Sequence, residues 1–551
     1  MIFGLIIKVL GSFMDLGLPW VLAYILDDII PLKDIGLILW WGVAMILLSI
    51  GARSFNIKAN RMASKVARDV MEELRHDLFV KIQSLSGTQL DYFTVASLES
   101  RMTTDTYNIH HMIGMMQRIG VRAPILLIGG TIITSTLEPV LTLVLAGVLP
   151  FLGVVVFLVS RKGIPLYTKL QLSIDRMVRV VRENISGVRV IKALSKTQYE
   201  KERFAKVNQE VSNKEQNAGL TMAITNPIMN FLLNFGLTLV IIVGAYRVNS
   251  GASEPGKIVA FLSYFTIMLH AVMAINRIFV VYSKAFASAA RIEEVLDSPE
   301  DLEEVSITPM NTEDHITFNH VSFSYTQEPC IKDVSFSIRK GESLGIIGST
   351  GSGKTTLINL LMRFYDVNEG SILIQGQDIR SIPKQELRKK FGVVFQNDVL
   401  FADTVAENIR IGRDLPIDNL WTAAEHAQAA EFVKELDGQL GFELAIKGSN
   451  LSGGQKQRLL ITRALAGQPE IIILDDSSSA LDYKTDAKLR KEIRENYSDT
   501  TVIMIAQRIS SVMQLDNILV IEDGQMVGYG THEDLMKNCD VYQKIYQSQI
   551  G

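Results

Sequence analysis

Long runs of apolar residues occupy most of the chain before about residue 290, whereas later residues alternate in the manner of a soluble domain. A helix needs roughly 20 mostly apolar residues to cross about 30 Å of hydrocarbon. The runs that reach this length are 2–26, 36–57, 112–135, 138–160, 222–246 and 256–282. The pattern therefore predicts six membrane-spanning helices. Because the first begins at about residue 2, we expect the natural N-terminus to lie upstream or to have been trimmed.

The connections between these runs alternate between short and long. The long ones include 60–85 and 169–215, where scattered charges accompany apolar residues at helical spacing. This pattern predicts spans that continue as helices into the cytoplasm and turn back at their far ends. Two solvated linkers are the alternative, which the scarcity of Pro and Gly disfavours.

Basic residues orient the spans. Lys and Arg are frequent in both long connections, whereas the three short ones contain only Lys33, Arg247 and Lys257. The positive-inside rule therefore places the long connections and both termini in the cytoplasm.

Composition agrees with a membrane protein of several domains. The 551 residues are 48% hydrophobic and 21% charged, whereas an average soluble domain has about 25% charged residues. The formal net charge of −4 gives no reason to expect nucleic acid as a partner. Cys330 and Cys539 have no metal-binding spacing and indicate isolated thiols in a reducing compartment.

A few polar side chains lie within the spans, where a carboxylate costs at least ~2.5 kcal/mol. Asp15 either contacts a cationic substrate or forms a local hydrogen bond. Asn226, Asn230 and Asn234 recur every four residues and share one helix face, which either joins helices or lines a transport pathway.

Two further features of the third span have simpler interpretations. Met112, Met115 and Met116 share a helix face, and we expect them to pack against other helices. Arg118 and Arg122 indicate the cytoplasmic end of the span.

The chain divides at a polar stretch after the last span. We predict a transmembrane domain over 1–296, a linker over 297–313 and an α/β domain over 314–551, in which strand and helix patterns alternate.

The α/β domain contains a phosphate-binding loop. The buried-strand run SLGII at 343–347 leads into GSTGSGKT at 348–355, and a helical pattern follows. Strand, glycine-rich loop and helix form the context that this motif requires. Backbone N–H groups at Gly351 and Gly353 can surround phosphate oxygens, Lys354 can reach the outer phosphates, and the Thr355 hydroxyl can coordinate Mg²⁺.

A second hydrophobic strand ends in a carboxylate. Residues 470–475 read EIIILD, so Asp475 is positioned to hold Mg²⁺ through water. An aspartate that merely caps the following turn is the alternative, and the neighbouring phosphate loop disfavours it.

Two further motifs identify a family. LSGGQKQR at 451–458 precedes this strand, and SALD at 479–482 follows it. The set resembles the ATP-binding cassette transporters, and a six-span domain placed before the cassette is similar to the exporter branch. The resemblance covers nearly the whole chain.

The resemblance implies roles for individual residues. Tyr325 would stack on adenine, and Gln396 would link Mg²⁺ to the membrane helices. The signature would contact the γ-phosphate of ATP held by the other cassette of a dimer, and Asp482 would act across that dimer. Turns near 89–95 and 194–202 would be coupling helices that rest on cassettes. The implied ATP-binding residues are Tyr325, Gly348, Ser349, Thr350, Gly351, Ser352, Gly353, Lys354, Thr355, Thr356, Gln396, Leu451, Ser452, Gly453, Gly454, Gln455 and Asp482, with Thr355, Gln396 and Asp475 around Mg²⁺.

Two catalytic positions depart from the family pattern. Asp476 stands where the family has a glutamate that activates water, and Gln507 stands where it has a switch histidine. Asp476 retracts the carboxylate by roughly 1 Å, a misplacement that can cost ~10²-fold in rate. Gln507 cannot exchange a proton near neutral pH. Together they indicate a site that binds ATP and hydrolyses it slowly.

Each ATP site of such a dimer combines one chain's phosphate loop with the other chain's signature. We therefore predict one half of a heterodimeric exporter, an ATP-hydrolysing translocase of the cell membrane with its cassette in the cytoplasm. Its partner would carry the glutamate and the histidine. Similarity to heterodimeric bacterial multidrug exporters implies amphipathic, often cationic, small molecules as cargo. The alternatives are a homodimeric lipid or peptide exporter with slow ATPase and an ATP-binding sensor that translocates nothing.

Overall fold

The computed structural model describes residues 2–299, 302–477 and 480–550, except for the side chains at 149, 152, 156, 159, 160, 164, 225, 226 and 276. It forms two compact units. The helical unit comprises Met1–Gln83 and Ala96–Ser298, and the cassette unit comprises Ser84–Val95 and Pro299–Gly551.

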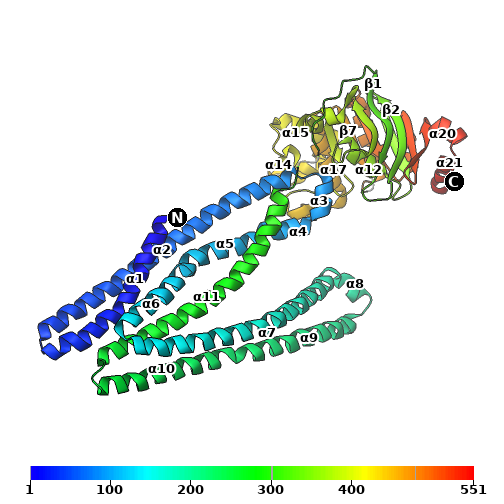
Figure 1. Ribbon diagram of the computed structural model, residues 1–551. Coiled ribbons are helices and arrows are strands. Elements are labelled where there is room, and N and C mark those ends of the chain that lie inside the picture. Colours follow the sequence, from blue (N-terminus) through cyan, green and yellow to red (C-terminus); the bar gives the residue numbers. More distant parts are fainter. Residues whose placement is uncertain (1, 300–301, 478–479, 551) are drawn as a thin grey trace. The chain divides into compact units, whose positions relative to one another are not determined.

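The helical unit consists of long helices with short breaks. Its elements are α1 (Ile2–Tyr24), α2 (Ile35–Ser84), α4 (Val95–Ser100), α5 (Thr106–Met115), α6 (Arg122–Leu137), α7 (Pro139–Ser186), α8 (Val188–Ala193), α9 (Thr197–Ala223), α10 (Thr225–Asn249) and α11 (Pro255–Leu296). Figure 1 shows α7 and α9 running side by side as a hairpin that ends at α8.

The apolar runs lie within these helices. Five helical stretches among the described residues are long and apolar enough to span a membrane, namely Ile2–Leu32, Ile35–Ser84, Val95–Leu137, Thr197–Asn249 and Pro255–Leu296. Pro139–Val155 is a shorter apolar stretch within α7 and corresponds to the fourth predicted span. The predicted helical extensions of the spans are present, because α2 continues to Ser84 and α7 to Ser186.

Polar side chains in the spans bond within the chain. Arg122 Nη2 donates to Asp15 Oδ2 at 2.8 Å, and Asn56 Nδ2 donates to the same oxygen at 3.2 Å. Asp15 therefore has the local partners that one of its two interpretations requires. Asn234 Nδ2 donates to the Asn230 backbone oxygen of its own helix at 2.9 Å, and both side chains are exposed. The side chain of Asn226 lies outside the described residues.

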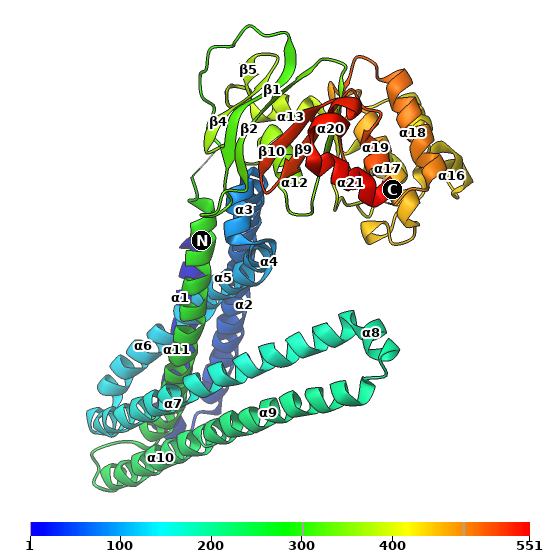
Figure 2. The ribbon, with the colours of Figure 1, turned by 90° about the vertical axis from the view of Figure 1, so that its right-hand side faces the viewer.

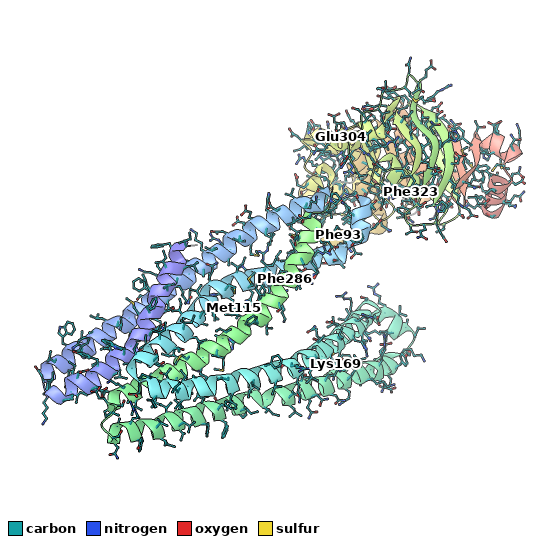
Figure 3. All side chains as sticks on the ribbon, in the orientation of Figure 1. Phe93, Met115, Lys169, Phe286, Glu304 and Phe323 are labelled. Carbon is teal, nitrogen blue, oxygen red and sulfur yellow. The ribbon has the colours of Figure 1, made fainter. Side chains whose placement is uncertain are left out.

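The methionine face divides between core and surface. Met115 is buried where α5 runs beside α11 (Figure 3), whereas Met116 is exposed. The packing expected of these methionines is therefore observed for Met115, whereas the side chain of Met116 is exposed. Arg122 pairs with Asp15 on α1, so its role extends beyond the predicted one of indicating the end of a span.

Two short helices form the turns at the ends of the extensions. Helix α3 (Gly87–Phe93) begins with a capping box between Ser86 and Gln89 and belongs to the cassette unit. Helix α8 lies at 188–193, and the non-helical residues 194–196 between α8 and α9 fall within the turn predicted near 194–202. Gly187, at φ −91° and ψ 8°, ends α7, and residues 197–202 already belong to α9. The apolar side chains of Ile185, Val190 and Leu194 at this tip are each more than 60% exposed.

Two sheets form the framework of the cassette unit. One has the order β2–β1–β4–β5, with antiparallel pairing throughout, and the other has the order β10–β9–β3–β8–β7–β6, with parallel pairing except between β10 and β9. The strands are β1 (Asp314–Phe323), β2 (Ile331–Arg339), β3 (Ser343–Gly348), β4 (Glu369–Ile374), β5 (Gln377–Asp378), β6 (Phe391–Val394), β7 (Ile471–Asp475), β8 (Thr501–Ile505), β9 (Asn517–Glu522) and β10 (Gln525–Gly530).

Helices pack against the larger sheet (Figure 2). They are α12 (Lys354–Leu361), α13 (Lys384–Lys389), α14 (Val405–Arg410), α15 (Ile417–His426), α16 (Ala430–Glu435), α17 (Gly453–Leu465), α18 (Tyr483–Asn496), α19 (Ile509–Val512), α20 (His532–Asn538) and α21 (Asp540–Ile550). Strands β7 and β8 are buried along their whole length, as expected for the centre of a parallel sheet. The predicted α/β fold is confirmed.

Candidate nucleotide site

Three parallel strands end at one edge of the larger sheet. Strand β8 lies between β3 and β7, so the segments that follow these strands are neighbours. Ligands of open parallel sheets bind beyond the carboxyl ends of the strands. A cavity of about 280 Å³ lies there, and Lys354, Gln396, Asp475, Asp476 and Gln507 contribute to its lining.

The glycine-rich loop has the conformation that the motif predicts. Gly351 and Gly353 have φ of +83° and +102°, which L side chains rarely adopt. A Cβ at Gly353 would lie 2.6 Å from Ile331 Cδ1, so a side chain is also excluded by packing. The loop leads directly into α12, whose free N–H groups attract anions.

One buried polar atom within the loop lacks a partner. Ser352 is 2% exposed, and its Oγ bonds to no group in the part of the chain that the structure describes. Such an atom typically costs 1–3 kcal/mol unless it is satisfied. Phosphate oxygens at the loop would satisfy it, so the residues present fit a nucleoside triphosphate.

The lysine of the loop is held in position by backbone oxygens. Lys354 Nζ donates to the carbonyl oxygens of Gly348 at 2.9 Å and Ser349 at 2.7 Å. Burial lowers the pKa of Lys354, although Asp475 and Asp476 oppose this effect. A phosphate placed in the loop would be a stronger acceptor than either carbonyl.

The expected Mg²⁺ ligands are adjacent. Thr355 Oγ1 donates to Asp475 Oδ2 at 2.9 Å, and Gln396 lines the same cavity. Burial raises the pKa of Asp475, and the nearby charge of Asp476 acts in the same direction. A divalent cation would relieve this penalty. One carboxylate, a hydroxyl and substrate phosphates form a set that Mg²⁺ commonly uses.

The two divergent residues bond to one another. Gln507 Nε2 donates to Asp476 Oδ2 at 3.1 Å. Asp476 has φ +49°, a region in which aspartate is one of the better tolerated residues. Burial raises the pKa of Asp476, while Arg508 and Lys354 lower it. The amide thus holds the carboxylate at the position where the family resemblance implies that water is activated.

Tyr325 lies beside the cavity. Its hydroxyl donates to Thr356 Oγ1 at 3.3 Å, and its ring is 44% exposed. An exposed ring suits the stacking on adenine that the resemblance implies.

The signature residues are absent from the cavity lining described above. Ser452 is exposed and caps α17 through a capping box with Gln455. A Cβ at Gly453 would meet no atom within 4 Å, so this surface is open. Asp482 caps α18 and bonds to Thr485 N at 2.9 Å. Among the described residues of the single chain, the phosphate loop and the signature therefore do not line a common cavity. Ser479 of the SALD motif lies outside the described residues.

Two residues at or near the cavity, Cys330 and Arg508, were not predicted from the sequence. Cys330, predicted as an isolated thiol, lines the cavity, and its Sγ lies 3.5 Å from Thr356 Oγ1. It precedes β2 and belongs to no motif, so the sequence contains no signal for it. Arg508 contributes to the field at Asp476 and stacks over Tyr483 at 5.1 Å. Its position next to Gln507 was the available signal.

Sequence profiles of two families match the chain. The family described as ABC transporter transmembrane region matches residues 1–272, and the family described as ABC transporter matches residues 331–479. A solved structure titled "Structure of a bacterial Atm1-family ABC exporter with ATP bound" superposes with a TM-score of 0.84 at 23% identity, over 100% of this chain and 98% of that one. This likeness shows the fold.

Relatives align along nearly the whole length. "Uncharacterized ABC transporter ATP-binding protein YfiB" of Bacillus subtilis is 34% identical over 551 residues, covering 100% of this chain and 96% of the relative. "Fatty acid ABC transporter ATP-binding/permease protein" of Mycobacterium bovis is 31% identical over 487 residues, covering 88% and 77%.

Proposed function

Since the chain belongs to the ABC transporters, as a multi-pass membrane protein with a cytoplasmic cassette, we propose that it is one half of a heterodimeric exporter of amphipathic small molecules. In this proposal its own phosphate loop forms a slow ATP site. Its signature completes a fast ATP site on a different partner chain.

The observation that carries the proposal is the pair Asp476 and Gln507. The two side chains bond at 3.1 Å between Gln507 Nε2 and Asp476 Oδ2. The bond uses a carboxylate oxygen that a water-activating residue would need. Gln507 supplies no group that changes charge near neutral pH. The phosphate loop itself retains the features that bind phosphate.

The roles of the remaining residues follow from their chemistry. Lys354 and the loop N–H groups would hold the phosphates, and Thr355 with Asp475 would hold Mg²⁺. The ion would neutralise charge on the phosphates. Ser452 and Gly453 would bind the γ-phosphate held by the partner, since a hydroxyl and N–H groups bind anions without adding charge. Closure of the two cassettes on ATP would switch the membrane helices from inward-facing to outward-facing.

Native mass spectrometry tests the pairing. The full chain, tagged at its C-terminus, would be extracted gently from its own membrane and its complex weighed. We expect the mass of this chain plus a different half-transporter. The sequence of that partner should contain the glutamate and the histidine at the two divergent positions. A mass of twice this chain would refute the heterodimer.

A homodimeric lipid exporter with slow ATPase is the second candidate. The relative named as a fatty acid transporter favours it. In a homodimer both sites would contain Asp476 and Gln507. The double variant Asp476→Glu with Gln507→His should then raise the ATPase rate of the purified homodimer by about 10²-fold, because both catalytic groups are restored.

A further inference from the structure

A pocket lies in the helical unit between α6 and α11. It has a volume of about 330 Å³ and is lined by alanines, by the aliphatic side chains of Ile119, Leu126 and Ile267, and by Arg122 and His270. An apolar pocket with a few convergent polar groups is the usual form of a small-molecule site.

The pocket lies within the membrane-spanning region, toward its cytoplasmic side. Arg122 is fifteen residues before the end of α6 at Leu137, and His270 is fifteen residues after the start of α11 at Pro255. At 1.5 Å per residue both lie about 22 Å from the outer ends of their helices. Because the hydrocarbon core is about 30 Å thick, the two side chains are closer to its cytoplasmic side.

Arg122, which lines the pocket, belongs to a group of basic side chains that share a single carboxylate. Lys8 Nζ donates to Asn60 Oδ1 at 3.0 Å, and Arg118 Nε donates to the Gly114 oxygen at 2.9 Å, so neither has an acidic partner in these bonds. The charges that act on Lys8 are those of Arg122, Arg118 and Asp15. Three basic side chains and one carboxylate therefore influence one another here, and Arg122 is the one of the four that lines the pocket.

The carboxylate is already engaged. Asp15 accepts from Arg122 Nη2 at 2.8 Å and from Asn56 at 3.2 Å. Arg122 retains donors, because within the described ranges its Nε has no partner and only its Nη2 bonds to a protein group. A cationic ligand would have to compete with Arg122 for Asp15, whereas an anion would find unused donors.

Uncompensated charge in a membrane is expensive, and an anion in this pocket would offset it. We propose that the pocket binds an amphiphile with a carboxylate head group, which contacts Arg122 and His270, and an alkyl chain that lies along the aliphatic lining. The inference rests on the proposed exporter function and names the charge of its cargo. It reverses the cationic cargo implied by the family resemblance.

Two ligands of equal chain length and opposite charge test the inference. The full chain, with whatever partner copurifies, would be placed in lipid nanodiscs and incubated with radiolabelled dodecanoate or dodecyltrimethylammonium. We expect saturable binding of dodecanoate. The variant Arg122→Gln should weaken it by at least about 10-fold, since it removes a charge-assisted hydrogen bond to the carboxylate. Arg122→Lys should restore part of the affinity.

The sign of the response to Asp15→Asn separates anionic from cationic cargo. Removing this carboxylate should strengthen dodecanoate binding, whereas a cation site would lose affinity. Lys33→Gln is the matched control, because it removes a cation from an exposed turn outside the pocket. The inference would be overturned if Lys33→Gln and Arg122→Gln lost dodecanoate affinity equally. It would also be overturned if the protein bound dodecyltrimethylammonium more tightly than dodecanoate and Asp15→Asn weakened that binding.

A measurement on the unmodified protein covers the case in which a variant fails to fold. A photoactivatable dodecanoate should label peptides that include 119–126 or 267–274, and labelling confined to other segments would overturn the inference. Failure of the site is distinguishable from failure of the proposed function. A heterodimer with ATPase but no dodecanoate binding refutes the site alone, and binding without ATPase in any pairing refutes the exporter alone.

Discussion

Asp475 and Asp476 place two adjacent carboxyl groups beside one lysine, and burial raises the pKa of both. A carboxyl group with a raised pKa in the folded state keeps its proton to higher pH than in the unfolded chain. As pH rises from the unfolded pKa through the folded one, the folded state therefore loses stability. Without a bound cation, the folded protein therefore keeps this loss of stability.

Asp475→Asn should raise the melting temperature of the nucleotide-free protein at pH 7, because the amide keeps the contact with Thr355 and removes a buried charge. The gain should shrink as pH falls toward the pKa of the unfolded carboxyl group. Differential scanning calorimetry of both proteins across pH checks this expectation. A gain that does not change with pH would contradict the electrostatic explanation. The same variant should lose the stabilisation that MgATP gives the wild type.

Helix α3 meets the cassette through a contact that lies within one compact unit. Gly87 N donates to the Phe364 oxygen at 3.1 Å, and the Tyr365 hydroxyl donates to Asp91 Oδ2 at 2.8 Å. A Cβ at Gly87 would lie 2.5 Å from Tyr365 Cζ and 2.8 Å from the Phe364 oxygen. The helix therefore seats closely on the segment that follows α12.

Gly87→Ala should weaken the seating of α3 by about 1–3 kcal/mol, the usual cost of overpacking, because backbone atoms must move. We expect ATP binding to be retained and cargo-stimulated ATPase to fall. Tyr365→Phe is the milder comparison, since it removes one hydrogen bond of about 1 kcal/mol. Equal cargo stimulation in Gly87→Ala and the wild type would show that α3 carries no coupling.

Local chemistry explains which elements could be predicted. The phosphate loop and the strand that ends at Asp475 are recognisable because their residue types and spacing perform the chemistry directly. The end of α7 at Gly187 was missed because a short break between long helices depends on small energy differences. The pairing of Asp15 with Arg122 joins residues 107 positions apart. No periodicity encodes such a contact, so the sequence left the role of Asp15 open.

The heterodimer proposal makes the two ATP-related surfaces of this chain unequal. Its phosphate loop would belong to the slow site and its signature to the fast one. A homodimer would distribute both surfaces equally over two identical sites. Variants that impair one surface at a time therefore distinguish the assemblies without knowledge of the cargo.

Gly453→Asp should reduce the ATPase of the purified complex more than 10-fold, because an acidic side chain would face the γ-phosphate of the partner's site. A Cβ at Gly453 meets nothing within 4 Å, so folding should be preserved. Gly441→Asp, which is equally open, is the control. Lys354→Ala should lower the rate much less than Gly453→Asp. Equal losses from both would contradict the unequal sites.

The tip of the α7–α9 hairpin has a consequence for the life of the protein in a cell. Ile185, Val190 and Leu194 remain exposed there in the single chain, and such apolar surface attracts chaperones and proteases. A second subunit that covers the tip would remove this apolar surface from solvent. Copies synthesised in excess, without a partner subunit, would then be degraded first. Proteolysis would thereby keep the two subunits in equal numbers even when their genes are expressed unequally.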